Sequence, residues 1–175
     1  MSLPEIRPWS PDMPVPAITA LLHAAYAPLA GMGFRYTATH QDDAMTFRRL
    51  STGWSFLAYL GNALAGTISL RGPAPVSDCP WYRQDGVFTF GQFGVLPECQ
   101  RQGIGRALLD HVEQRAAREG AEALALDTAE GAIHLIRWYQ NLGYRQIDLV
   151  SWDDTNYRSV VLSKPLRAPA LPADG

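Results

Sequence analysis

A glycine-containing turn between a strand-like run and a helical pattern constrains the fold of this chain more than any other feature. The turn reads Gln100-Arg101-Gln102-Gly103-Ile104-Gly105; Val95-Leu96-Pro97 precedes it, and a helical pattern runs on to Gly120. The start of a helix presents backbone N–H groups at the positive end of the helix dipole, and glycine lacks the Cβ that would keep a ligand away. The turn therefore predicts a strand-to-helix unit with a site for phosphate or pyrophosphate.

Two common phosphate-binding motifs do not fit this turn. A nucleoside-triphosphate loop needs lysine after its last glycine, whereas Gly105 precedes Arg106 and the chain has a single lysine, Lys164. A dinucleotide fingerprint needs a third glycine where Leu108 stands. Taken alone, the glycine pair is equally compatible with a tight turn that binds no ligand, because glycine is the usual turn residue.

Hydrophobic periodicity and turn residues predict the element order β-α-α-β-β-β-α-β-α-β-β, which is a mixed α/β fold with a partly antiparallel and partly parallel sheet. The expected strands cover residues 3–7, 54–60, 64–70, 87–95, 123–127, 145–150 and 157–162. The first helix is expected between Asp12, as its cap, and a loop that spans residues 28–40. Residues 1–166 are expected to form one domain, and residues 167–175 a disordered tail.

The composition excludes several classes of protein. A net charge of −2 gives no basic surface for nucleic acid, and no run is long and apolar enough for a membrane span. The N-terminus lacks the features of a signal peptide, which favours a cytoplasmic protein. Two cysteines form no disulfide framework, and with four scattered histidines they give no metal-site spacing.

Two sequence blocks together resemble the GNAT superfamily of N-acetyltransferases. Val95-Leu96-Pro97 followed by Gln100-x-x-Gly103-x-Gly105 is similar to that family's acetyl-CoA motif, Arg/Gln-x-x-Gly-x-Gly/Ala, and Tyr139-Gln140-Asn141-Leu142-Gly143-Tyr144 is similar to its Tyr-x-x-x-Gly-Phe/Tyr signature. The resemblance covers roughly residues 53–164. It implies a GNAT-like mixed sheet whose two central parallel strands splay apart around the site for acyl-CoA.

The resemblance also implies which residues bind acetyl-CoA. The phosphates would lie on the backbone N–H groups of the turn, with added charge from two arginines: Gln100, Arg101, Gln102, Gly103, Ile104, Gly105 and Arg106. The pantetheine arm would pair with the strand backbone at Phe93 and Val95, whose side chains are equally suited to core packing.

For catalysis, the resemblance assigns Tyr139 as the general acid that protonates the CoA sulfur; by periodicity alone it is a buried core tyrosine. The chain departs from the family at two points. Ala132 stands where an asparagine is frequent, and no acidic residue precedes the motif on its strand. The candidates for the general base are Asp127, Glu130 and Glu98, and the alternatives to them are a water chain or a substrate amine with a lowered pKa.

The acceptor site is expected between the loop that follows the first helix and the last strand pair, at Tyr36, Trp152, Asp153 and Asp154. Aromatic rings beside carboxylates bind a cationic amine, although an Asp-rich hairpin with solvated charges has the same sequence. The sequence thus predicts acetyl-CoA-dependent acetyl transfer to a primary amine of a small molecule, peptide or protein, in a ternary complex. The alternative is a non-catalytic acyl-CoA-binding or regulatory module, and both a monomer and a homodimer are compatible with the sequence.

Overall fold

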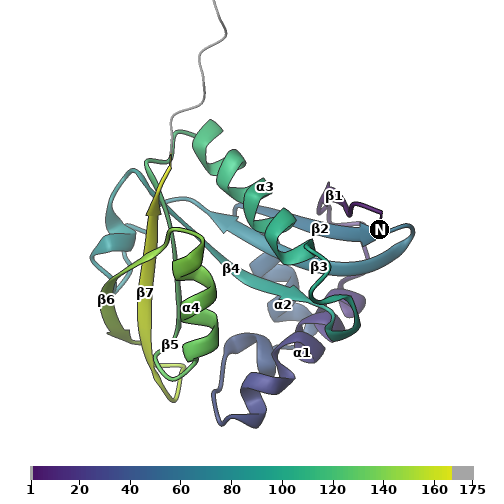
Figure 1. Cartoon of the computed structure of the whole chain (residues 1–175), viewed down its shortest axis with the longest axis horizontal. Coiled ribbons are helices and arrows are strands. Elements are labelled where there is room, and N and C mark those ends of the chain that lie inside the picture. The colour runs from purple at the N-terminus through teal and green to yellow at the C-terminus, as the bar shows by residue number, and fades with distance from the viewer. Residues whose placement is uncertain (1, 167–175) are drawn as a thin grey trace, which may run out of the picture.

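A seven-stranded sheet in the order β1-β2-β3-β4-β5-β7-β6 forms the centre of the computed structural model, which describes residues 2–166 (Figure 1). The strands are β1 (Glu5–Pro8), β2 (Trp54–Leu60), β3 (Ala63–Arg71), β4 (Val87–Val95), β5 (Ala123–Ala129), β6 (Arg145–Ser151) and β7 (Arg158–Pro165). Strands β4 and β5 pair in parallel, and the other neighbours pair antiparallel. The predicted element order and mixed sheet are confirmed. The predicted tail, residues 167–175, lies outside the described residues.

Four α-helices accompany the sheet in the described part of the chain: α1 (Val15–Gly31), α2 (Asp43–Leu50), α3 (Ile104–Arg118) and α4 (Ile133–Asn141). Two expectations about α1 were wrong. Asp12 does not cap it, because Pro14 occupies the N-cap and Asp12 bonds to Ser10 instead. The helix also continues past Pro28 to Gly31, since Leu29 is buried in a cluster with Tyr36 and holds the last turn in place. None of these helices is long and apolar enough to cross a bilayer.

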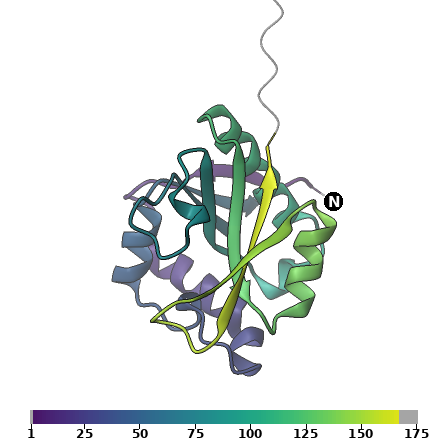
Figure 2. The ribbon, with the colours of Figure 1, turned by 90° about the vertical axis from the view of Figure 1, so that its left-hand side faces the viewer.

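The two faces of the sheet carry different layers. On one face, alternate residues such as Phe88, Phe90 and Leu124 pack against α3 and α4 in the main hydrophobic core. The opposite face carries α1 and α2 at one end and the segment of residues 72–86 at the other, where Tyr82 and Cys79 are buried. Figure 2 shows α4 and this segment on opposite sides of β5 and β7.

The parallel strands β4 and β5 splay apart, as the family resemblance implies. They pair only where Val87–Thr89 of β4 meets Ala123–Ala125 of β5. Beyond this, β4 runs on to Val95 and β5 to Ala129 with no pairing between the two strands within the described residues. The gap leaves backbone groups of β4 free for a ligand, since strand hydrogen bonds no longer satisfy them.

A bulge interrupts β4 inside the splayed stretch. The register with β3 shifts between Thr67↔Gly94 and Ser69↔Gly91, so two residues of β4 oppose one of β3. Gln92 lies in this bulge with a φ of 47°, and its buried amide oxygen accepts a 2.9 Å hydrogen bond from Nε2 of Gln41. The bulge thereby turns the following residues of β4 toward the gap.

Candidate active site

A cavity of about 450 Å³ extends from the glycine turn along the end of β4, between α1 and α4. Its lining includes all but one of the residues predicted to bind the cofactor: Phe93, Val95, Gln100, Arg101, Gly103, Ile104, Gly105 and Arg106. Gln102 is the exception; its side chain donates to the carbonyl of Glu98 and is exposed. Phe93 and Val95 line the cavity and also pack against the main core, so the two roles predicted for them coexist.

The turn owes its shape to two residues with positive φ. Gly103 is the N-cap of α3 with a φ of 82°, and Arg101 has a φ of 61°. The side-chain amide of Gln100 donates a 3.2 Å hydrogen bond to the Val95 carbonyl, which ties the turn to the end of β4. Gly103 offers no side-chain cap, so the first-turn N–H groups of α3 stay available to an anion. These features fit the pyrophosphate of CoA.

Of the two arginines in the turn, Arg106 already has a partner. Its Nε donates to Oδ1 of Asp110 over 2.9 Å in an exposed i,i+4 ion pair, which raises the pKa of the guanidinium. Arg101 is exposed at the rim of the cavity. Because exposed ion pairs contribute little, Arg106 can exchange Asp110 for a phosphate at small energetic cost.

Tyr139 lies on the buried face of α4, where its ring contacts Phe90 and Tyr144. It lines the cofactor cavity and also the neighbouring cavity described next. Burial raises the pKa of the Tyr139 phenol well above its ordinary value. A phenol carries its proton at neutral pH, as a general acid must, and the raised pKa means that Tyr139 gives this proton only to a strongly basic group such as a departing thiolate.

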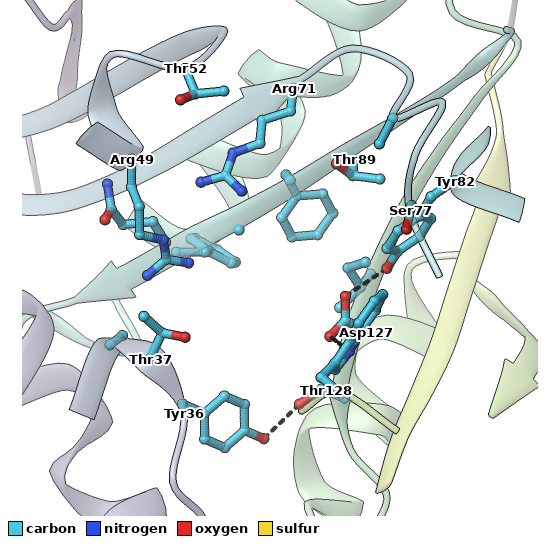
Figure 3. A pocket seen from close by; sticks show the side chains of 18 of the residues that line it. Tyr36, Thr37, Arg49, Thr52, Arg71, Ser77, Tyr82, Thr89, Asp127 and Thr128 are labelled. Carbon is cyan, nitrogen blue, oxygen red and sulfur yellow. Dashed lines mark hydrogen bonds between the residues drawn. The ribbon is translucent and has the colours of Figure 1, made fainter. Parts of the chain in front are cut away.

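A second cavity of about 640 Å³ lies on the other side of the splayed strands (Figure 3). Tyr26, Phe93 and Tyr139 line both cavities, so the two spaces meet at these three side chains. Burial raises the pKa of the Tyr26 phenol to about 12. Two ligands that enter from opposite sides would meet beside Tyr139, which is the arrangement that direct group transfer requires.

Asp127 is the acidic residue that the fold places deepest in this second cavity. Strand alternation directs it to the same face as Ala123 and Ala125, where Tyr82 donates to Oδ1 over 2.7 Å and Trp152 donates to Oδ2 over 3.0 Å (Figure 3). Burial raises the pKa of the Asp127 carboxyl, and the two hydrogen bonds partly oppose that shift. A carboxylate with a raised pKa is a better proton acceptor than a solvated one.

The other two candidates for the general base lie elsewhere. Glu130 forms an exposed, two-point ion pair with Arg158 at 2.7 and 2.9 Å, which lowers the pKa of the carboxyl. Glu98 is exposed in the short helix before the glycine turn. Neither belongs to the lining of the two cavities.

Three of the four predicted acceptor residues line the second cavity. The Tyr36 hydroxyl bonds to the Thr128 hydroxyl at 2.8 Å and accepts from the Ala129 amide at 3.0 Å. Trp152 lies beside Asp127, and Asp154 stands at the cavity edge. Asp153 is exposed and lies outside the lining, because neighbouring residues in this turn point in different directions.

The structure adds cavity residues that the sequence did not indicate: Tyr26, Arg49, Arg71 and Tyr82. Tyr26 lies within α1, Arg49 stands near the end of α2 and Arg71 ends β3, and no local motif marks any of them. Only the packing of α1, α2 and the 72–86 segment onto one face of the sheet brings them together. At the start of α4, Ala132 is fully buried, and His134 lines the first cavity.

The family model described as "Acetyltransferase (GNAT) family" matches residues 18–144. The chain therefore belongs to the GNAT acetyltransferase family, whose co-substrate is acetyl-CoA.

Individual relatives support this assignment. The chain is 27% identical over 125 residues to "S-(2-succino)cysteine N-acetyltransferase" of Bacillus subtilis (strain 168), covering 69% of this chain and 72% of the relative. It is 34% identical over 58 residues to the "[Ribosomal protein bS18]-alanine N-acetyltransferase" of Escherichia coli (strain K12), a match that covers 33% of this chain and 39% of the relative. A GNAT acetyltransferase from Elizabethkingia anophelis, solved with acetyl-CoA bound, has the same fold, with a TM-score of 0.66, 20% identity and 93% and 98% coverage.

Proposed function

We propose that the protein transfers an acetyl group directly from acetyl-CoA to a primary amine, with both ligands bound at once. The observation that carries this mechanism is the meeting of the two cavities at Tyr26, Phe93 and Tyr139. Acetyl-CoA supplies an acetyl thioester, whose C–S bond breaks as the C–N bond of the amide forms. Its phosphates would lie on the turn around Gly103, and its pantetheine arm along Phe93–Val95.

Two proton transfers follow from the placement of the acidic groups. Asp127, on the acceptor side, takes a proton from the substrate ammonium, so that the free amine can attack. Tyr139, between the cavities, gives its phenolic proton to the departing sulfur. The nitrogen of the new amide then gives up its second proton, which restores the Tyr139 phenol, and Asp127 releases its proton to solvent. An ammonium substrate and acetyl-CoA thus yield the amide, the free CoA thiol and one proton. Location in the cytoplasm and the choice between monomer and homodimer stay predictions.

Release of free CoA thiol in the presence of acetyl-CoA and a panel of amines tests the function. The panel should include amino acids, polyamines and short peptides, because the two named relatives act on a modified cysteine and on a protein alanine. We expect thiol release that depends on one class of amine. Tight binding of CoA without transfer to any member of the panel would instead favour the non-catalytic acyl-CoA-binding module.

A further inference from the structure

Two arginines give one wall of the acceptor cavity a concentrated positive charge. Arg49 stands near the end of α2 and Arg71 is the last residue of β3, and both side chains point into the cavity (Figure 3). Neither forms an ion pair with a carboxylate within the described residues 2–166. Burial lowers the pKa of both guanidinium groups, yet arginine keeps its charge at any ordinary pH.

The surrounding residues hold these side chains in place without neutralising them. Arg49 donates a 2.5 Å hydrogen bond to the neutral amide oxygen of Gln41, which is itself bonded to Gln92 in the β4 bulge. The Arg49 guanidinium lies over the β4 bulge, where a Cβ at Gly91 would be in ordinary van der Waals contact with Nη2 at 3.8 Å. Because the group that orients Arg49 is neutral, the positive charge of this arginine stays available to a ligand.

The alternation of side chains along β3 sets the direction of Arg71. Its neighbour Leu70 is fully buried in the main core, so Arg71 points from the opposite face into the acceptor cavity. Its Nε is buried and has no hydrogen-bond partner among the described residues. A buried donor without a partner costs stability, and a bound acceptor group would satisfy it.

The opposite wall carries the negative charge. Asp127 of β5 faces the arginines across the cavity and is held by Tyr82 (Figure 3). The exposed Asp154 also lines this cavity. A ligand with an ammonium group at one end and an anionic group at the other matches this separation of charge. A neutral or purely cationic amine would leave both guanidinium groups without a counter-charge in a partly desolvated site.

We propose that the acceptor is an amino acid-like amine, whose carboxylate binds Arg49 and Arg71 while its amino group faces Asp127. This inference rests on the proposed acetyl transfer and names its substrate class. Guanidinium groups bind carboxylates through paired, charge-assisted hydrogen bonds, which add orientation as well as affinity. That orientation would direct the amine toward Tyr139 and the thioester.

Matched pairs of acceptors test the proposal. L-Alanine is compared with L-alaninamide, and L-glutamate with L-glutamine, by following thiol release from acetyl-CoA. The amine of alaninamide is the more easily deprotonated of the two, so a preference for alanine would not reflect a larger supply of free amine. The alanine pair tests the α-carboxylate, and the glutamate pair tests a side-chain carboxylate. In the pair that varies the carboxylate bound by the arginines, we expect kcat/KM to be about 10- to 100-fold higher for the carboxylate than for its carboxamide. O-Phosphoethanolamine is included, and a preference for it over every amino acid would overturn the carboxylate assignment.

Substitution of Arg49 and Arg71 tests whether these two residues cause the preference for a carboxylate. Arg71→Gln and Arg49→Gln should raise KM for the carboxylate acceptor and so lower the ratio of its kcat/KM to that of the carboxamide. KM for acetyl-CoA should stay within about twofold of wild type. Arg71→Lys should recover part of the advantage, because it keeps the charge but loses the planar fork. Arg48→Gln is the control, since Arg48 is exposed on the same helix and lies outside the cavity. Equal losses on carboxylate and carboxamide would overturn the proposal.

A binding measurement separates this inference from the proposed function. If amines are acetylated with no preference for carboxylates, the inference fails and the function stands. If no amine releases thiol, the CoA-loaded protein is titrated with N-acetyl-L-alanine and with its carboxamide. If the wild-type protein binds the carboxylate more tightly than the carboxamide and Arg71→Gln does not, the two arginines bind carboxylates even in a protein that transfers no acetyl group. Equal affinity for the two compounds in the wild-type protein would overturn the inference.

Discussion

Tyr82 donates a 2.7 Å hydrogen bond to Oδ1 of Asp127, which joins the segment before β4 to the splayed end of β5. The bond fixes one carboxylate oxygen, while burial raises the pKa of the group. A carboxylate accepts several hydrogen bonds, so the bonds from Tyr82 and Trp152 leave lone pairs free for a substrate ammonium. The contact therefore orients a base without blocking it.

Replacement of that base is the first test of the mechanism. Asp127→Asn should lower kcat by roughly 10²- to 10⁴-fold, the range that positioned acid–base groups contribute. Because the pKa of Asp127 is raised, wild-type activity should fall with decreasing pH at a pH above the ordinary aspartate range, and the variant should lack that acid limb. The pH profile of kcat checks this. Glu130→Gln, outside the cavities, is the matched control and should keep the wild-type profile.

Removal of the Tyr139 hydroxyl tests the general acid. Tyr139→Phe keeps the ring that packs on Phe90 and should leave the affinity for acetyl-CoA within about twofold, while kcat falls roughly 10²-fold or more. Tyr144→Phe is the control: its ring belongs to the same cluster, but its hydroxyl donates to Glu113 away from the cavities. Steady-state kinetics with calorimetric CoA binding compare the two. Unchanged turnover in Tyr139→Phe would remove this residue from the mechanism.

The glycine at the N-cap of α3 offers a test of phosphate binding that separates charge from backbone strain. Gly103 has a φ of 82°, which Asp and Asn tolerate better than other side chains, and a Cβ there would meet open space. Gly103→Asp should abolish the thermal shift caused by acetyl-CoA, because its carboxylate opposes the pyrophosphate. Gly103→Asn, nearly equal in size, should retain most of the shift. Equal effects in both variants would place the phosphates elsewhere.

The contact between Gly66 of β3 and Leu108 of α3 sets how closely the helix approaches the sheet. A Cβ on Gly66 would lie 2.9 Å from Cδ1 of Leu108, a fully buried side chain. Gly66→Ala should lower the free energy of unfolding by about 1–3 kcal/mol through overpacking. Leu108→Ala should lower it by about 2–5 kcal/mol through a cavity. Denaturant unfolding of the double variant should show a smaller loss than the sum, because the added methyl fills part of the space; strict additivity would contradict this contact.

The sequence by itself determined the element order, and it predicted the residues of the cofactor half of the site. The strand, glycine turn and helix around Gly103 are contiguous, so local backbone preferences are enough to place an anion site there, and the spacing to Tyr139 identified the family. Gln102 was included with the turn because position in the chain does not reveal which way a side chain points.

The sequence suggested Asp127 and three further residues of the acceptor half separately, and only the tertiary structure brought them together and added the two arginines. Asp127, Arg49 and Arg71 lie on three elements separated by up to 78 positions, and no local pattern relates them. They meet because β4 and β5 stop pairing after Thr89 and Ala125, and because α2 and the 72–86 segment cover the same face of the sheet. Strand register and the packing of helices on the sheet bring these charged side chains together. Both depend on long-range contacts, which hydrophobic periodicity along the chain does not specify.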